Sequence, residues 1–411
     1  MLRTHFAALA ARSVNAISRI LRQGSGTVAG GRVALKIDPR FLAKRSDGHR
    51  VVLVSGTNGK TTSTALVAAA LREAGCKVVS NETGSNMPAG HAAALTKLSG
   101  EAVIVLETDE PYLAHVAQAT QASVIVLLNL SRDQLDRSNE VRMLAERWKA
   151  MVDLSSATVV ANADDPLVAW AASEARSVIW VGAGLAWRED ARSCPWCAGL
   201  MSFAQNGRWS CSCGKSRPAC TIELESGANE SDSGLSLEGK HFGLQLALPG
   251  RFNQGNAALA LGAAKALGID IATAIKGMES LAAVAGRFST ISLAGRQLQL
   301  LLAKNPAGWA ALLTERSSHS GPLVLALNAR IADGADPSWI YDVPFELLRG
   351  KQLVVTGDRR HDLSVRLFYA DVAHEVAKTP ALALEAIAPL GASAEFIGNY
   401  TAFHELAGGS L

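Results

Sequence analysis

Short apolar, β-branched runs alternate with alanine-rich stretches of helical length from about residue 50 onward. The runs predict strands at Val51–Ser55, Lys77–Ser80, Ala102–Leu106, Val124–Leu128, Thr158–Ala161 and Val178–Val181. Two further stretches, Thr61–Ala74 and Glu140–Met151, predict helices. Strands separated by helices of this length form βαβ units, in which the strands are parallel. We therefore predict an α/β fold with a mainly parallel sheet covered on both faces.

This rhythm stops at about residue 187, and Gly, Ser, Cys and polar residues dominate until about residue 240. Two helices rich in Ala or Ile follow, at Asn256–Leu267 and Ile271–Leu281. Strand signals then resume at Ile291–Leu293, Leu298–Leu302, Leu323–Leu327 and Gln352–Thr356. We expect three parts: an N-terminal helical segment (1–45) packed on a central domain (46–288) with an insertion at 187–222, and a smaller α/β C-terminal domain (289–411).

The N-terminal segment is basic, with no acidic residue before Asp38. An acid-poor, amphipathic start is typical of a mitochondrial transit peptide, but it also fits a helix that packs on its own domain. The glycines at 24–26 and 30–31 are predicted to end that helix. Because the sequence continues smoothly through Lys36–Pro39 into the folded part, we favour the packed helix.

Composition and charge restrict the class of protein. The chain has 411 residues, and its 40 Lys and Arg nearly balance 37 Asp and Glu, which argues against a dedicated nucleic-acid-binding protein. With 48% hydrophobic and 19% charged residues, it is neither disordered nor a coiled coil. No apolar run approaches the roughly 18–20 residues that span a bilayer. We therefore expect a soluble, globular protein.

The most informative motif follows the first predicted strand. Gly56-Thr57-Asn58-Gly59-Lys60-Thr61-Thr62 is a tight glycine turn that opens a helix. Glycines let backbone amides wrap around phosphate oxygens, and the helix N-terminus favours negative charge. Lys60 is placed to contact the terminal phosphates and the Thr61 hydroxyl to hold Mg²⁺. The strict pattern has glycine at the position of Val54, yet the strand and the Lys-Thr-Thr run still predict an ATP-binding P-loop.

This variant of the loop resembles that of the Mur ligase family, which activates a carboxylate as an acyl phosphate and joins it to an amine. Over about residues 46–310, further segments match the family in order, namely Glu107, Asn129–Asp136, Asn162–Pro166, Leu248–Asn256 and Gly286–Phe288. The resemblance implies that Glu107 shares Mg²⁺ with Thr61 and that Lys60 acts with Arg287 on the transferred phosphoryl group. It also places Asn253 and Asn256 at the nucleotide.

Two positions depart from the family pattern. Gln134 stands where the family carries a histidine, which puts a second metal site in doubt. Leu301 replaces an aspartate, and its side chain cannot accept a hydrogen bond from ribose. We therefore expect the C-terminal domain to hold nucleotide differently from a ligase that adds an amino acid.

Five of the six cysteines cluster within the insertion. Cys194-Pro-Trp-Cys197 precedes Cys211-Ser-Cys213, and four thiolates from two such turns are the ligand set of tetrahedral structural zinc. The second turn is one residue shorter than usual, so Cys220 is an alternative to Cys211 or Cys213. Unliganded, reduced cysteines are the other interpretation, although this segment has few apolar residues to fold on its own. We predict a zinc ribbon with four cysteine ligands that stabilises the fold.

A Mur ligase domain with a cysteine insertion is similar to one branch of the family, the MurT-type synthetase subunits of lipid II isoglutaminyl synthase. Segments between Leu302 and Arg366 also agree with that branch. The resemblance implies amidation of the D-glutamate α-carboxylate in the lipid II stem peptide. It further implies a heterodimer with a GatD-like glutaminase subunit that delivers ammonia, and a cytoplasmic location at the inner face of the membrane. Cys76 lacks the glycine elbow of a glutaminase nucleophile, so we place that activity on another chain.

The resemblance also implies that one aspartate of the C-terminal region completes the partner's Cys–His pair. The candidates are Asp333, Asp336, Asp342 and Asp362. We take Asp336, in the polar loop before Ser338-Trp339, as this catalytic residue. Trp309 and Trp339 fit either a partner surface or the core.

Two other functions fit parts of the sequence. One is a folylpolyglutamate- or UDP-MurNAc-peptide-type ligase that adds an amino acid without a partner; Gln134 and Leu301 argue against it. The other is a nucleotide-binding scaffold without catalysis. The presence of Lys60, Thr61 and Glu107 together with Arg287 argues against that second alternative.

Overall fold

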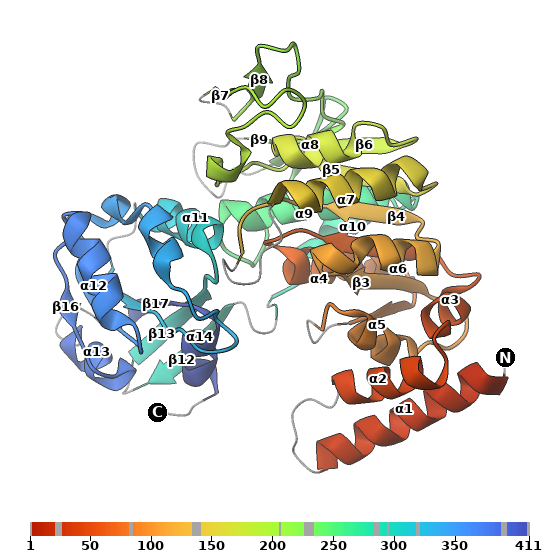
Figure 1. Cartoon of the computed structure of the whole chain (residues 1–411), viewed down its shortest axis with the longest axis horizontal. Coiled ribbons are helices and arrows are strands. Elements are labelled where there is room, and N and C mark those ends of the chain that lie inside the picture. Colours follow the sequence, from red (N-terminus) through yellow and green to blue (C-terminus); the bar gives the residue numbers. More distant parts are fainter. Residues whose placement is uncertain are drawn as a thin grey trace. The chain divides into compact units, whose positions relative to one another are not determined.

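The computed structural model describes residues 2–20, 27–81, 85–133, 141–204, 207–225, 234–282, 284, 288–293, 296–317, 321–387 and 393–408. The chain forms two compact units (Figure 1). The first comprises residues 1–130 and 141–282, and the second comprises 131–140 and 283–411. None of the helices in these described ranges combines the length and apolar character that crossing a membrane requires.

A nine-stranded sheet forms the centre of the first unit, in the order β11-β10-β9-β6-β5-β4-β1-β3-β2. From β6 to β2 every pairing is parallel. The six strands of this part are β1 (Val51–Ser55), β2 (Val78–Ser80), β3 (Val103–Glu107), β4 (Val124–Leu127), β5 (Thr158–Asn162) and β6 (Val178–Gly182). Every residue of β1 and β3 is buried, as expected for strands covered on both faces. The predicted α/β fold with a mainly parallel sheet is confirmed.

Helices cover both faces of this sheet. One apolar core joins the sheet to α3 (Phe41–Ser46), α5 (Pro88–Leu95), α6 (Leu113–Thr120), α7 (Val141–Leu154) and α8 (Pro166–Ala172). On the opposite face, α4 (Lys60–Glu73), α9 (Arg251–Ala266) and α10 (Ile271–Glu279) pack against one another. Helix α9 begins five residues before the predicted start at Asn256. It is buried along most of its length, because it packs on the sheet and against its neighbour α4.

The N-terminal segment contains two helices, α1 (Leu2–Ile20) and α2 (Thr27–Ile37). The prediction that the glycines at 30–31 end a helix is wrong, because both lie inside α2. A Cβ atom at Gly30 would lie 2.4 Å from the carbonyl oxygen of Ala11, and one at Gly31 would lie 1.7 Å from that of Ala89. These glycines therefore allow α2 to lie close against α1 and α5.

Three strands that the sequence did not suggest extend the sheet beyond β6: β9 (Ile222–Glu225), β10 (Gly234–Leu237) and β11 (Lys240–Gly243). β9 pairs with β6 in parallel, and β10 and β11 continue antiparallel. In β9 the buried positions alternate with half-buried ones. Strands that are buried on one face only lack the continuous apolar run of the central strands. Because every second residue is polar, the sequence pattern did not distinguish this segment from a loop. A separate hairpin, β7 (Met201–Phe203) with β8 (Trp209–Cys211), lies in the insertion, and Cys211 is its last residue.

The second unit has a six-stranded sheet in the order β12-β13-β17-β14-β15-β16. Only the pair β12 (Phe288–Leu293) and β13 (Arg296–Leu302) is antiparallel among its described pairings. The other strands are β14 (Leu323–Ala326), β15 (Leu353–Thr356), β16 (Glu375–Val376) and β17 (Ser393–Gly398). Helices α11 (Pro306–Arg316) and α12 (Arg360–Tyr369) share one apolar core, and α13 (Pro380–Ala386) and α14 (Tyr400–Ala407) share another. This unit is a second α/β sheet with helices on both faces.

Candidate active site

The phosphate loop connects β1 to α4 in the first unit. Gly59, the residue before α4, has a φ of 86°, in the left-handed region that glycine adopts without strain. A Cβ atom there would lie 2.4 Å from Oδ1 of Asn256, and one at Gly56 would lie 2.7 Å from Cβ of Leu128. Both glycines are therefore required by close neighbours as well as by the turn. Helix α4 begins at Lys60, so Thr61 and Thr62 lie in its first turn, next to this glycine turn.

Asn129, two residues after the end of β4, holds this loop from the side. Its Oδ1 accepts a hydrogen bond from the backbone N–H of Asn58 at 3.0 Å, and its Nδ2 donates to the carbonyl oxygen of Asn58 at 3.0 Å. The backbone N–H of Thr57 donates to the carbonyl oxygen of Asn129. These three bonds fix the loop conformation before any ligand binds, which reduces the ordering cost of binding phosphate.

Glu107 is the last residue of β3 and lies opposite Val54 in the neighbouring β1, two residues before the loop. The side chain of Asn81, which follows β2, accepts from its N–H and donates to its carbonyl oxygen, both at 2.8 Å. Glu107 is 2% exposed, and in the described part of the chain its carboxylate takes part in no hydrogen bond or ion pair. A buried carboxylate beside a phosphate loop is a suitable ligand for a divalent cation.

His91, on α5, is a second support of Glu107 that the sequence analysis did not single out. Its Nε2–H donates to the carbonyl oxygen of Glu107 at 2.8 Å. The ring is fully buried, and this burial lowers the pKa of His91 to about 4. The imidazole is therefore neutral at pH 7. In the sequence, the position of Asn81 directly after a predicted strand could have indicated a role in the site. No such feature marks His91, because it lies within an alanine-rich helix.

Lys60 is buried, and its ammonium group lies among carboxylates. Nζ is 2.9 Å from Oε2 of Glu110 and 3.3 Å from Oδ1 of Asp109. Both acids follow β3 on the same segment as Glu107, so the ends of β1 and β3 bring the lysine and three acids into one region. Buried charges require such partners, because an unpaired ammonium group loses its hydration.

The other predicted nucleotide contacts differ in where they lie. Asn256 on α9 lies against Gly59, and its Nδ2 donates to Oδ1 of Asn253 at 3.3 Å. Nδ2 of Asn253 donates to the carbonyl oxygen of Pro249. The structure therefore brings Asn256 to the phosphate loop with Asn253 as its neighbour. Arg287 lies outside the described residues, as do Gln134 and Asp136.

Four cysteines converge in the insertion. The Sγ atoms of Cys194, Cys197, Cys211 and Cys213 all lie within 4.8 Å of one another. Cys194 and Cys213 are 3.8 Å apart and Cys197 and Cys211 are 3.5 Å apart, close to the roughly 3.8 Å edge of a tetrahedron with Zn–S bonds of about 2.3 Å. A backbone hydrogen bond from Cys213 lowers the pKa of Cys211 to about 6, which favours its thiolate. This group can hold a metal ion.

Cys220 lies apart from that group; its thiol donates to the carbonyl oxygen of Pro218. The ribbon is held on the first unit by Trp209, whose Nε1–H donates to the carbonyl oxygen of Ala163 at 2.9 Å. Arg217 adds an ion pair with Asp164, two residues after the end of β5. The ribbon is thus anchored to the end of a central strand. Asp165, fully buried next to this contact, has its pKa raised by burial to about 6.

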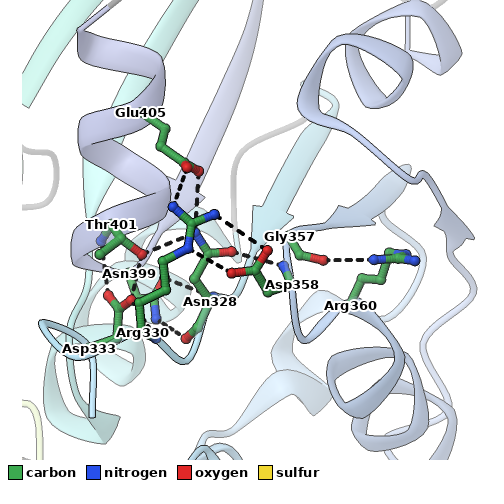
Figure 2. A network of polar contacts seen from close by, with 9 residues as sticks. All are labelled: Asn328, Arg330, Asp333, Gly357, Asp358, Arg360, Asn399, Thr401 and Glu405. Atoms are coloured by element: carbon green, nitrogen blue, oxygen red, sulfur yellow. Dashed lines mark hydrogen bonds and ion pairs between the residues drawn. The ribbon is translucent and has the colours of Figure 1, made fainter. Parts of the chain in front are cut away.

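A polar network occupies the carboxyl ends of β14, β15 and β17 in the second unit (Figure 2). The side chain of Asn399 accepts a hydrogen bond from the backbone N–H of Asn328 and donates one to its carbonyl oxygen. Oδ1 of Asn328 in turn accepts from the N–H of Asp358 at 2.9 Å. Arg330 forms ion pairs with Asp358 and Glu405. The helix after β17 and the helices after β13 and β15 lie on opposite faces, so this is a switch point of the sheet, where α/β proteins commonly bind ligands.

The candidate aspartates of this unit have different surroundings. Asp333 is buried, and its carboxylate accepts hydrogen bonds from both the N–H and the hydroxyl of Thr401 and from the N–H of Arg330 (Figure 2). Asp336 is exposed and accepts from the N–H and hydroxyl of Ser338, bonds that lower its pKa. Asp342 pairs with Arg132, and Asp362 pairs with Arg359.

Several other predictions about this unit can be compared with the structure. Trp309 and Trp339 are buried in its core, so the partner-surface interpretation of these two residues is wrong. Leu301 is buried in the same core. Asp133 accepts hydrogen bonds from Lys304 at 2.7 Å and from Asn305 at 3.0 Å. These bonds join a segment that resembles the Mur ligase family to one that resembles its MurT-type branch.

Comparisons with known proteins agree with this arrangement. The Mur ligase middle domain model matches residues 54–190. A pseudomurein peptide ligase type C from Methanothermus fervidus has a similar structure, with a TM-score of 0.72 and 20% identity over 90% of this chain and 81% of that one. The chain therefore has the Mur ligase fold.

The C-terminal unit narrows this class, because the MurT ligase C-terminal model matches residues 302–403. The chain is 30% identical to the MurT subunit of lipid II isoglutaminyl synthase (glutamine-hydrolyzing) from Staphylococcus aureus strain COL, over 90% of this chain and 87% of that protein. It is 31% identical to the corresponding protein of Streptococcus pneumoniae, over 88% and 85%. The chain belongs to the MurT family, and this membership identifies it as an ATP-dependent ligase.

Proposed function

We propose that the chain is the synthetase subunit of a lipid II isoglutaminyl synthase. It amidates the α-carboxylate of D-glutamate in the lipid II stem peptide to give D-isoglutamine, as a step of peptidoglycan synthesis. The observation that carries this proposal is the combination, in one chain, of a preformed phosphate loop beside buried Glu107 with a MurT-type C-terminal unit. Two MurT subunits with 30–31% identity over most of the chain support it.

The proposed reaction has two steps. A substrate carboxylate oxygen attacks the γ-phosphorus of ATP, ADP leaves, and an acyl phosphate forms. The nitrogen of ammonia then attacks the acyl carbon, phosphate leaves with the carbon–oxygen electron pair, and ammonia loses a proton. Lys60 and Arg287 offset charge on the transferred phosphoryl group, and Thr61 with Glu107 hold Mg²⁺, which neutralises phosphate charge. The loop residues Gly56–Thr62, with Asn253 and Asn256, form the rest of the nucleotide site.

At low ammonium concentrations the ammonia must come from a partner, because at neutral pH free ammonia is mostly protonated and then has no lone pair to attack with. We propose a GatD-like glutaminase subunit that forms a heterodimer with this chain. Asp336 would orient the histidine of the partner's Cys–His pair, as the third group of a catalytic triad does. Its exposed, ionised carboxylate supports this assignment. Asp333 is less available to a histidine of the partner, because its carboxylate already accepts hydrogen bonds from Thr401 and Arg330.

We also propose that Cys194, Cys197, Cys211 and Cys213 hold zinc. Four protein ligands leave no open position for a substrate, so the metal would stabilise the ribbon and not take part in the reaction. Because lipid II is anchored in the membrane, we place the reaction in the cytoplasm at the inner membrane face.

The test is a product-mass assay with purified chain, ATP, Mg²⁺, lipid II and glutamine, with and without the glutaminase. We expect the –OH to –NH₂ mass change only when both proteins are present. Ammonium chloride should replace glutamine and the glutaminase together, and the Lys60→Ala variant should then be inactive. Addition of an amino acid without the partner would contradict the proposal in favour of an ordinary Mur-type ligase.

A further inference from the structure

Helix α1 has an apolar face that no described part of the chain covers. Leu2, Phe6, Leu9 and Ile17 are 90%, 63%, 63% and 55% exposed. Their spacing of four, three and eight residues places them on one side of the helix. Single exposed apolar side chains are ordinary on protein surfaces, but four aligned on one side of a 19-residue helix indicate an interaction surface.

The opposite side of α1 is firmly attached to the first unit, so this face is not exposed because the helix is loose. Ala7 and Ala11 are fully buried in the main core. The Thr4 hydroxyl donates to Oδ2 of Asp38 at 2.7 Å, and Nε of Arg12 donates to the carbonyl oxygen of Thr96 at 2.9 Å. Helix α1 packs on α2, which in turn packs on α5 (Figure 1). The apolar face therefore points outward from a fixed position.

The charge around this face identifies the kind of partner. The first 45 residues carry nine Lys and Arg and one acid, Asp38, whereas the remaining residues carry 31 Lys and Arg and 36 acids. On α1 itself, Arg3, His5 and Arg12 are exposed. With a rotation of about 100° per residue, they flank the apolar face on both sides. An anionic surface with an apolar interior complements this pattern.

We propose that the apolar face of α1 lies in the interface of an anionic lipid bilayer, with the helix parallel to the membrane plane. Helices with an apolar face bordered by basic residues bind membranes in this way without spanning them. A second copy of the chain fits less well, because two such faces would bring their flanking cations together. The inference goes beyond the proposed function, since it depends only on α1; it would bring the catalytic unit to a lipid-anchored substrate.

The experiment measures sedimentation of the full chain with protein-free vesicles. We expect binding to vesicles of equal parts phosphatidylcholine and phosphatidylglycerol, weaker binding to pure phosphatidylcholine, and a decrease as salt screens the charges. The double variant Phe6→Ser, Leu9→Ser should lose at least about tenfold in affinity. The control variant Leu154→Ser, Leu200→Ser removes two apolar side chains elsewhere on the first unit that are even more exposed than Phe6 and Leu9, and it should bind like the wild type.

Three results would overturn the inference: no binding of the wild type to either vesicle, an equal loss in both double variants, or a wild-type dimer that Phe6→Ser, Leu9→Ser converts to monomer in light scattering. Thermal unfolding of each variant separates loss of binding from loss of fold. The vesicles contain no substrate, so these results are independent of the amidation assay. The Phe6→Ser, Leu9→Ser variant should still amidate detergent-solubilised lipid II.

Discussion

Asn81 binds the backbone of Glu107 through both groups of its side-chain amide. Oδ1 accepts from the Glu107 N–H and Nδ2 donates to the Glu107 carbonyl oxygen, each at 2.8 Å. β2 is only three residues long, and Asn81 follows it directly, so the amide continues the pairing of β2 with β3 by one more residue. The carboxylate beside the phosphate loop thus keeps its position at the point where the regular sheet ends.

Replacement of Asn81 by Ala should therefore lower the rate of ammonium-dependent amidation. The buried N–H of Glu107 would lose its partner, a loss that costs about 1–3 kcal/mol, and its carbonyl oxygen would keep only the hydrogen bond from His91. We expect kcat to fall about tenfold or more, because a displaced Glu107 holds the cation less well. Steady-state kinetics measure this effect. The variant Gln245→Ala, which removes an exposed side-chain amide, is the control and should keep a normal kcat. A normal kcat for Asn81→Ala as well would show that Glu107 does not need this support.

The pKa of His91 predicts a pH dependence of stability. Burial lowers this pKa to about 4 in the folded chain, whereas an unfolded histidine titrates near 6.5. Between these values the unfolded state binds the additional proton. The free energy of unfolding should therefore fall as the pH decreases from 6.5 to 4, by an amount on the order of 3 kcal/mol from this residue alone.

Urea unfolding at pH 7 and pH 4 measures that change. The His91→Gln variant keeps a side-chain donor but does not titrate in this range, so its loss of stability between the two pH values should be smaller. Equal losses in the wild type and the variant would contradict the assignment of a neutral, buried His91.

Metal analysis of the purified chain should give one zinc ion per molecule. Cys197→Ser should reduce this content and change the fluorescence of the ribbon tryptophans, because Trp196 and Trp209 stack with ring centroids 6.0 Å apart. Cys220→Ser is the matched control within the insertion and should keep its zinc, since its sulfur lies outside the group of four. Equal zinc loss in both variants would disprove the ligand assignment.

The two aspartates of the 333–336 segment should respond differently to replacement by asparagine. Asp336→Asn should abolish glutamine-dependent amidation while ammonium-dependent amidation and stability stay unchanged, because the side chain is exposed. Asp333→Asn should lower the free energy of unfolding by about 1–3 kcal/mol, since its carboxylate accepts three hydrogen bonds. If Asp333→Asn selectively lost the glutamine-dependent reaction instead, the triad role would pass to Asp333.

The sequence by itself determined the features that depend on local pattern. The apolar runs predicted β1 and its parallel neighbours, because strands buried on both faces must be continuously apolar. The glycine turn with Lys60 and Thr61 predicted the phosphate loop, since backbone close to phosphate requires glycine. The spacing of Cys194, Cys197, Cys211 and Cys213 predicted the metal-binding ribbon.

The tertiary structure decided what depends on residues distant in the chain. Asn81 and His91 support Glu107 from elements 16–26 residues away, and no local pattern marks such contacts. Gly30 and Gly31 resemble helix terminators in isolation, yet they are helical because neighbouring backbone leaves no room for a Cβ. In the same way, only packing shows that Asp333 is buried while Asp336 is exposed, because burial is a property of the assembled fold.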